Sequence, residues 1–237
     1  NRYFAVSTDK AADPFNLMGA SKRLMEASIF LSGIESYSTR FANVAFSKGS
    51  LLASFPQRIA NNQPIPVPNK IKRFLITESE AAEICLLSAF STPKNSVLIP
   101  KSGLLEEIEL KGILENYLNT LDLKPEYFDN KDMAIKFLDQ KNVNDKKYPV
   151  VLTEPVTTGE KISEKFLASD EVTKEHLENF DIILSQERNE PNISHFINDF
   201  ENITNEKLTK KQIVDLTLKY LPTMSHKETN KSLNSQI

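Results

Sequence analysis

The chain has 237 residues, 40% of them hydrophobic, which is enough for one good-sized domain or for a domain with an appendage. Its 29 basic and 32 acidic side chains leave a net charge of −3, so neither a general nucleic-acid binder nor a membrane-surface binder is indicated. No stretch reaches the roughly 18 to 20 apolar residues of a membrane span. The single cysteine, Cys85, cannot form an internal disulfide and lies in an apolar run, which predicts a buried thiol in the reducing cytoplasm.

Patterns typical of strands and helices alternate along the first part of the chain. Short apolar runs predict strands, whereas longer stretches of helix-forming residues predict helices. Gly33 marks the end of the first helix, and Pro64–Pro68 is expected to be extended because proline is not tolerated inside a helix. The predicted strands cover residues 3–7, 35–44, 96–100 and 148–153, and the predicted helices cover 16–31, 51–61, 77–90 and 106–121. This alternation predicts an α/β fold with a parallel sheet.

The character of the chain changes after residue 121. Residues 122–147 are polar and charged, and the Thr-Thr-Gly-Glu-Lys segment at 157–161 is typical of a loop. From about residue 181 the chain is helix-prone and polar, with 205–221 as its clearest amphipathic stretch. We therefore divide the chain into three regions, which are residues 1–100, residues 101–180 and a helical tail at residues 181–237.

Glycine is scarce in this sequence. Only six glycines occur, and none of them forms a G-x-G-x-x-G turn after a predicted strand. Such a turn, at the start of a helix, holds the pyrophosphate of a bound dinucleotide. The chain also opens without a methionine, directly in a strand-like segment and without a signal-peptide pattern. We therefore expect a trimmed or partial sequence that lacks the dinucleotide-gripping half of such a fold.

The polar residues that follow the first predicted strand are the strongest candidates for chemistry. Thr8, Asp9 and Lys10 lie where that strand ends, and reactive groups gather at the carboxyl ends of strands in α/β sheets. Met18 and Lys22 are spaced i, i+4 and therefore share one face of the helix that follows. If that face turns back to the strand end, a carboxyl, two ammonium groups and a hydroxyl converge, which suits acid–base chemistry. By composition alone, a polar turn with a solvated charge pair is the simpler interpretation.

The pattern as a whole resembles the extended short-chain dehydrogenase/reductases of polysaccharide biosynthesis, and more narrowly the UDP-N-acetylglucosamine 4,6-dehydratases. The resemblance covers nearly all of the chain. It rests on the segments at residues 7–11, 13–14, 18–23, 40–47, 49–52, 71–77, 157–161 and 226–229. It implies a doubly wound, Rossmann-like parallel sheet of which this chain is the C-terminal part. Residues 1–100 would then belong to the NAD(P)-binding catalytic domain with part of the sugar-nucleotide pocket, and 101–180 to a substrate-binding region.

The resemblance also implies roles for the residues around the first strand. These enzymes usually carry Tyr-x-x-x-Lys, in which the lysine holds the nicotinamide ribose. Lys22 keeps that place, with Ser7 as a second cofactor-binding residue, whereas Met18 stands where the tyrosine would be. A thioether cannot take a proton, and this substitution is a feature of one branch of the dehydratases. In that branch Thr8 would bond the sugar C4 hydroxyl.

The same resemblance implies a three-step cycle. Hydride leaves C4 for the nicotinamide, which gives a 4-keto sugar with an acidified C5 proton. Lys10 removes that proton while Asp9, in its acid form, protonates the departing C6 hydroxyl. Hydride then returns to C6, and the product is a 4-keto-6-deoxy sugar nucleotide. An epimerase acting at C4 would share the first step, but it has no need to expel the C6 hydroxyl.

Residues further along the chain are candidates for the UDP-N-acetylhexosamine. Asn43 follows the second predicted strand, where relatives bond the diphosphate, and Arg73 suits a phosphate clamp because a guanidinium bonds two oxygens at once. Ser50 and Gln57 are candidates for the nucleotide pocket, and Glu160 resembles a ribose-contacting glutamate. A surface arginine and a plain turn are the simpler interpretations of Arg73 and Glu160. No metal site is expected, since the three histidines show no ligand spacing.

Two hypotheses of different classes remain open. One is a nucleotide-sugar dehydratase with NAD(P) as cofactor, with an epimerase of the same superfamily as the alternative enzyme. The other is a non-catalytic fragment or association module, because the glycine turn is missing and this chain alone is then expected to be inactive. A homo-oligomer in the cytoplasm, with no nucleic-acid partner and no membrane segment in this chain, completes the prediction, the oligomer by analogy with the wider superfamily.

Overall fold

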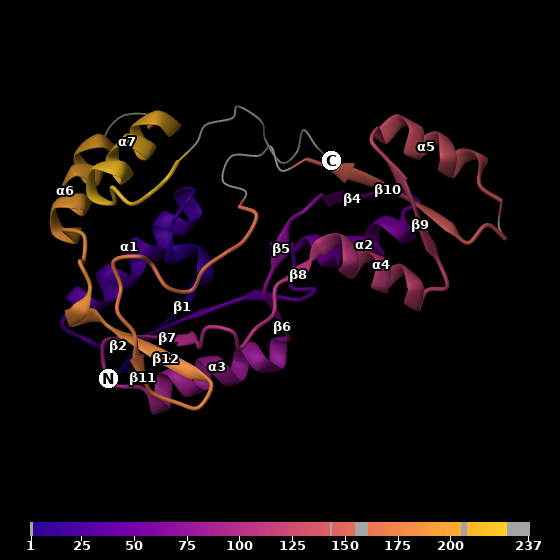
Figure 1. Ribbon diagram of the computed structural model, residues 1–237. Helices are drawn as coiled ribbons and strands as arrows, with labels where there is room; N and C mark the ends of the chain where they lie inside the picture. The colour runs from indigo at the N-terminus through magenta and orange to yellow at the C-terminus, as the bar shows by residue number, and fades with distance from the viewer. Residues whose placement is uncertain (1, 143, 155–160, 205–207, 227–237) are drawn as a thin grey trace. The chain divides into compact units, whose positions relative to one another are not determined.

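The computed structural model describes residues 2–142, 144–154, 161–204 and 208–226 (Figure 1). Their contacts divide the chain into two compact units. The first unit lies within residues 1–42, 79–105 and 164–228, and the second lies within residues 43–78 and 106–163. Each unit is therefore assembled from segments that are far apart in the sequence.

The first unit contains a five-stranded sheet. Its strand order is β1 (Arg2–Thr8), β2 (Glu35–Phe41), β7 (Ser96–Pro100), β12 (Phe180–Leu184) and β11 (Lys174–Glu175). The first three strands run parallel, as predicted, and the α/β fold is confirmed. The last two strands pair in the antiparallel sense, which the sequence pattern did not predict.

Helices cover both faces of this sheet. In Figure 1, α1 (Leu17–Leu31) lies on one side of the sheet and α3 (Glu78–Ser91) on the other. Strand β7 is buried along its whole length, as expected for a central strand that helices cover on both faces. Apolar residues of α1 and the strands form the core between them, namely Ala5, Ile29, Phe30, Val97, Ile99 and Ile183.

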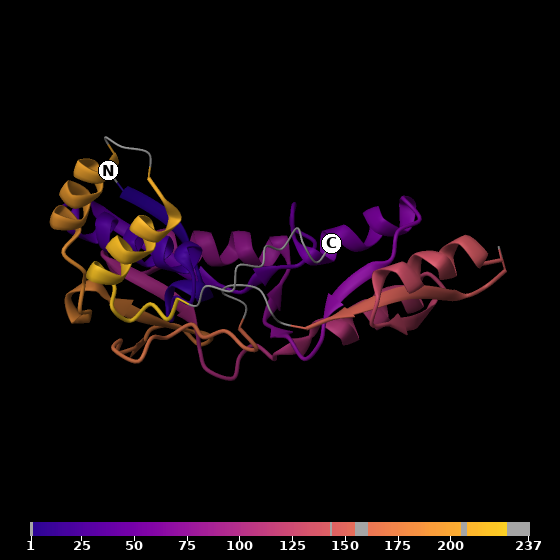
Figure 2. The same cartoon turned by 90° about the horizontal axis from the view of Figure 1, so that it is seen from above.

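Two further helices pack against α1. Figures 1 and 2 both show α6 (Ile193–Thr204) and α7 (Lys210–Tyr220) side by side next to α1. Ala20 of α1 packs in one apolar cluster with Val214 of α7, and other residues of α1 pack with Ile193 of α6. The polar, helix-prone tail is thus tied to the same helix that carries Lys22.

The second unit is built on a three-stranded parallel sheet. The strand order is β4 (Ile65–Pro68), β10 (Lys147–Thr153) and β9 (Lys124–Phe128). Three helices accompany it, which are α2 (Leu51–Ala60), α4 (Leu110–Thr120) and α5 (Lys131–Gln140). Leucines of α4 fill the centre of the core together with Phe55, Ile65, Val67 and Val150. The segment 122–147, known from the sequence only as polar and charged, therefore holds both a strand and a helix.

Two short strand pairs complete the second unit. β3 (Asn43–Val44) pairs in parallel with β6 (Leu75–Ile76), and β5 (Lys72–Arg73) pairs with β8 (Ile108–Glu109) in the antiparallel sense. The predicted strand at 35–44 is consequently interrupted at Ala42, where the chain passes from the first unit to the second. These pairs place Asn43 and Arg73 within the second unit.

Candidate functional site

The end of β1 carries a compact group of polar side chains. Thr8 caps the short 3-10 helix Asp9–Ala11, and its hydroxyl donates a hydrogen bond of 2.7 Å to Oδ1 of Asp9. The Lys10 ammonium donates to the same oxygen at 2.9 Å. A hydroxyl, a carboxylate and an ammonium are thus joined directly, as the sequence predicted for this strand end.

Burial sets this group apart from a solvated charge pair. The side chain of Asp9 is 0% exposed and that of Lys10 is 22% exposed. Within the described part of the chain, Oδ2 of Asp9 is buried and has no hydrogen-bond partner. A buried acceptor that is left without a partner costs free energy.

Helix α1 closes in on this strand end through a glycine. A Cβ built on Gly19 would lie 2.5 Å from the carbonyl oxygen of Lys10, so only glycine permits this approach. Asn16 caps the helix by accepting a 2.9 Å hydrogen bond from the Gly19 backbone N–H. One turn later, Lys22 donates at 3.1 Å to the carbonyl oxygen of Val6 in β1. Met18, on the same helix, is about half exposed.

Ser7 faces the interior instead of the strand-end group. Its hydroxyl donates to Oε1 of Glu26, and both residues are buried. Burial alone raises the pKa of Glu26, but Arg40 and Arg188 and the hydrogen bonds from Arg40 and Ser7 outweigh it and lower that pKa to about 2. Ser7 therefore connects the strand end to a buried network of charges.

This network was missed at the sequence level. Arg40 bonds Glu26 at 2.9 and 2.7 Å and bonds Glu171 at 2.6 and 2.7 Å. Arg188 donates to Glu26 at 2.8 Å, and Arg23 donates to Glu171. The network ties α1 and β2 to the segments around 171 and 188. The one signal available in the sequence was an arginine inside an otherwise buried strand, since buried charges require partners.

The second unit contains a cavity of about 520 Å³. Three of the residues predicted to bind substrate, Asn43, Ser50 and Arg73, line it. Gln57 is exposed and is not among the lining residues, and Glu160 lies outside the described residues. The structure thus gathers most of the predicted substrate residues, which come from three separate stretches of sequence, around one cavity.

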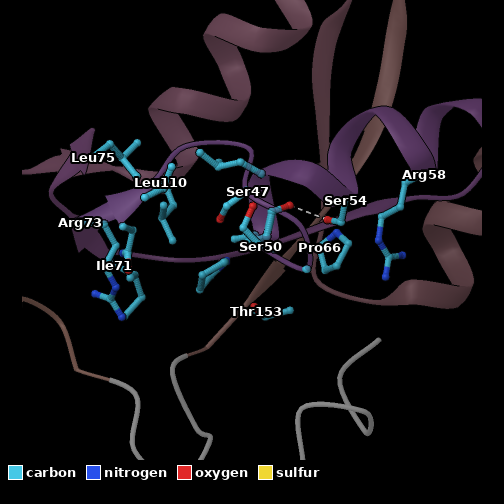
Figure 3. Close-up of a pocket in the computed structure, with 16 residues that line it drawn as sticks. Ser47, Ser50, Ser54, Arg58, Pro66, Ile71, Arg73, Leu75, Leu110 and Thr153 are labelled. Carbon is cyan, nitrogen blue, oxygen red and sulfur yellow. Dashed lines mark hydrogen bonds between the residues drawn. The ribbon is translucent and has the colours of Figure 1, made fainter. Parts of the chain in front are cut away.

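The lining of this cavity suits a ligand with both charged and apolar parts. Figure 3 shows Arg73 and Arg58 toward opposite ends, with the hydroxyl-bearing Ser47 and Ser50 between them. Arg73 donates at 2.9 Å to the carbonyl oxygen of Lys161, which holds its guanidinium in place. Burial lowers the pKa of Arg58 from its ordinary value. Apolar walls complete the cavity, from residues that include Leu52, Pro66, Pro68, Ile71, Leu75 and Leu110.

Arg58, Ser47, Ser54 and Thr153 were not singled out from the sequence. A helical arginine and scattered hydroxyls are common surface residues, and only the fold of the second unit brings them to the cavity. Cys85, expected to be buried, is only partly buried, and burial raises the pKa of its thiol. Across the described ranges, no three His, Cys, Asp or Glu side chains are grouped so that they could hold a metal ion. In the same ranges no helix is long and apolar enough to cross a membrane.

Comparison with known families decides the relationship of this chain. A model of the family described as "Polysaccharide biosynthesis protein" matches residues 1–185, which is most of the 237 residues. The chain belongs to this family. The match includes the strand-end group and the cavity. It also includes Glu26, Arg40 and Glu171 of the buried network, whereas Arg188 lies beyond it.

The curated relatives of this chain are distant, and two of those compared below are named for polysaccharide biosynthesis or for a sugar-nucleotide reaction. An uncharacterized membrane protein of Methanocaldococcus jannaschii is 26% identical over 70% of this chain and 51% of its own length. The capsular polysaccharide biosynthesis protein CapD of Staphylococcus aureus is 27% identical over 58% of this chain and 23% of its own length. A UDP-glucose 4-epimerase of Rickettsia bellii is 28% identical over 43% of this chain and 32% of its own length. The chain therefore spans about half, or less, of the length of these relatives.

A solved structure supports the fold. Pen from Bacillus thuringiensis superimposes with a TM-score of 0.61 at 23% identity. The superposition covers 78% of the present chain and 52% of Pen. At this identity the likeness establishes the α/β fold, and function has to be argued from the site.

Proposed function

We propose that this chain carries the acid–base and sugar-binding part of an NAD(P)-dependent nucleotide-sugar 4,6-dehydratase that acts on a UDP-N-acetylhexosamine in surface polysaccharide biosynthesis. The observation that carries this proposal is the buried group at the end of β1. It joins Thr8, Asp9 and Lys10 by direct hydrogen bonds, and Lys22 is anchored on the same strand. An acid and a base held side by side are what the expulsion of a hydroxyl next to an acidified carbon requires.

The fit to a nicotinamide cofactor rests on Lys22. An ammonium has three N–H donors; here one goes to the Val6 carbonyl oxygen and a second lies 4.0 Å from the Met25 sulfur, which leaves a donor for a ribose hydroxyl. The hydroxyl of Ser7 is committed to Glu26, so Ser7 is not part of this proposal. When bound at Lys22, NAD(P) would supply the hydride chemistry at C4 and C6. The choice between NAD and NADP stays open.

The residues of the chain would handle the protons of this reaction. Thr8 would bond the C4 hydroxyl and pass its proton to Asp9, over the 2.7 Å hydrogen bond that joins them. Lys10 would take the proton from C5, and Asp9 would give its proton to the C6 hydroxyl, which leaves as water. Lys10 would finally return its proton to C5. The sugar then has lost one water, and Asp9 and Lys10 are back in their starting forms.

The cavity of the second unit is the proposed place of the UDP group. Arg73 and Asn43 would bond the diphosphate, because a guanidinium and an amide N–H₂ both donate to phosphate oxygens. Ser50 also lines this cavity, and its apolar lining suits a nucleoside ring (Figure 3). A cavity of several hundred Å³ is in the range of small-molecule sites.

An epimerase is the second candidate, because a UDP-glucose 4-epimerase of Rickettsia bellii is among the relatives. Dehydration is favoured over epimerisation by the buried Asp9–Lys10 pair, since inversion at C4 needs no acid for the C6 hydroxyl. A cytoplasmic location and a homo-oligomer belong to the same proposal and rest on the single cysteine and on analogy, respectively.

The experiment supplies the protein with UDP-N-acetylglucosamine and either NAD⁺ or NADP⁺, and identifies the sugar nucleotide by mass spectrometry and NMR. We expect a product that has lost one water, and no such product from the Lys10→Met variant. A C4 epimer of unchanged mass would replace the dehydratase by the epimerase. Calorimetry with the UDP-sugar tests the remaining alternative, since an association module would bind neither the sugar nucleotide nor the cofactor.

A further inference from the structure

A second carboxylate lies beside Lys10 in the first unit. Oε1 of Glu164 is 4.0 Å from the Lys10 ammonium, while Asp9 is at 2.9 Å. The side chain of Glu164 is 4% exposed, so it is almost as buried as that of Asp9. The ammonium therefore lies near two buried carboxylates, one next to it in the sequence and one contributed by a segment more than 150 residues further along the chain.

The proposed reaction places two protons on this group at once. Before Lys10 can accept the C5 proton, its ammonium has to give up one of its own protons. By that stage the proton of the C4 hydroxyl has already passed to Asp9. One carboxylate cannot hold both protons and still act as the acid for the C6 hydroxyl. A second acceptor within reach of Lys10 would let the lysine lose its proton without using Asp9.

We propose that Glu164 is this acceptor, a positioning residue that holds Lys10 beside Asp9 and takes the lysine proton when substrate fills the site. Burial supports this role, because removal of water favours the neutral forms of both a carboxyl and an amine. Asp9 is not available for it, because Asp9 is already assigned the proton of the C4 hydroxyl. The inference rests on the proposed dehydration and adds a residue that was not recognised in the sequence.

The location of Glu164 gives this role a structural basis. The segment that carries it continues to Glu171, which is fixed by the buried arginines Arg23 and Arg40. Glu171 also accepts a 2.9 Å hydrogen bond from the backbone N–H of Ala168. The segment is therefore held by a buried network at one end, and Glu164 projects its carboxylate toward Lys10 at the other.

The first test needs no cofactor or substrate. The chain is trace-labelled with acetic anhydride at neutral pH, and mass spectrometry gives the rate at Lys10 relative to that at Lys22. Glu164→Gln removes an anion about 4 Å from the ammonium, so we expect relative labelling of Lys10 to rise about tenfold, because a nearby opposite charge favours the charged form. Glu164→Asp keeps the carboxylate and should restore most of the original rate. Glu175→Gln, which removes an exposed partner of Lys101, is the matched control and should leave Lys10 unchanged.

The second test follows proton removal at C5. The chain is incubated with UDP-4-keto-6-deoxy-N-acetylglucosamine in deuterated water, and exchange at C5 is followed by NMR. This step needs no hydride transfer. The keto sugar brings no C4 hydroxyl proton, so Asp9 could take the lysine proton here, and the comparison is therefore made in Asp9→Asn. Adding Glu164→Gln to Asp9→Asn removes the remaining acceptor of the pair, so exchange should slow by about tenfold or more relative to Asp9→Asn alone. In the same background Glu164→Asp should exchange faster than Glu164→Gln, and Glu175→Gln should match Asp9→Asn.

The two tests separate this inference from the proposed function. Unchanged labelling of Lys10 in Glu164→Gln, or no slowing of C5 exchange when Glu164→Gln is added to Asp9→Asn, would overturn the role of Glu164. Absence of C5 exchange from the unaltered chain would instead remove the dehydration itself, and the labelling would then report only whether Glu164 controls Lys10. Circular dichroism of each variant ensures that a lost fold is not mistaken for a lost acceptor.

Discussion

Glu26 accepts hydrogen bonds from two buried arginines, Arg40 and Arg188. Its replacement tests how much the buried network contributes to the free energy of unfolding. The side chains of Glu26 and Arg40 are both 0% exposed, and the pKa of Glu26 falls from 4.5 to about 2. Each pKa unit corresponds to about 1.4 kcal/mol, so the shift represents about 3 kcal/mol of folding free energy. Glu26→Gln keeps the shape of the side chain but removes the charge, and should lower the free energy of unfolding at pH 7 by about 3 kcal/mol.

The pH dependence of this loss has a definite sign. Because the folded-state pKa of Glu26 lies below its ordinary value, the unfolded chain takes up the proton first as the pH falls. The stabilisation is therefore complete above about pH 4.5 and is lost as the pH falls toward about 2. The difference between the unaltered chain and Glu26→Gln should shrink over that window.

Urea unfolding followed by circular dichroism, at a series of pH values, measures both quantities. Glu175→Gln is the control, since this glutamate is exposed and its pairing with Lys101 should contribute little. A loss at pH 7 of less than about 1 kcal/mol, the range of a surface ion pair, would refute the reasoning. So would a loss that stays constant as the pH is lowered from 5 to 2.5.

Two further predictions concern the packing of α1 and the cavity. Gly19→Ala should destabilise the protein by about 1–3 kcal/mol, because the added Cβ would overlap the Lys10 carbonyl oxygen. Thermal unfolding measures this loss. The control is Gly112→Ala, where a Cβ meets nothing within 4 Å, and it should be neutral or stabilising. Arg73→Ala should weaken binding of a UDP-sugar by about tenfold to a hundredfold, as expected for lost hydrogen bonds to a charged group. Calorimetry measures this affinity, and the exposed neighbour Lys72→Ala is the control; equal affinity of both variants would argue against a diphosphate at Arg73.

The sequence by itself determined the local features of this protein. Alternating apolar runs and helix-forming stretches predicted β1, α1, β2 and β7, because strand and helix preferences act over a few residues. Local preferences also place Asp9 and Lys10 at the end of a strand. The fixed spacing along one helix face then allows Lys22 of the next helix to contact that strand. The absence of a G-x-G-x-x-G turn from these 237 residues was also visible, because that motif is local.

Only the tertiary structure decided which distant residues meet. The contacts of Arg40 with Glu171 span 131 positions, and nothing near either residue in the sequence specifies the other. Glu164 reaches Lys10 because the chain returns to the first unit after building the second. Arg58 lines the cavity because helix α2 packs within the second unit. Burial gives these contacts their chemical importance, because a charge that is excluded from water requires a partner. A carboxylate buried beside an amine can also accept its proton.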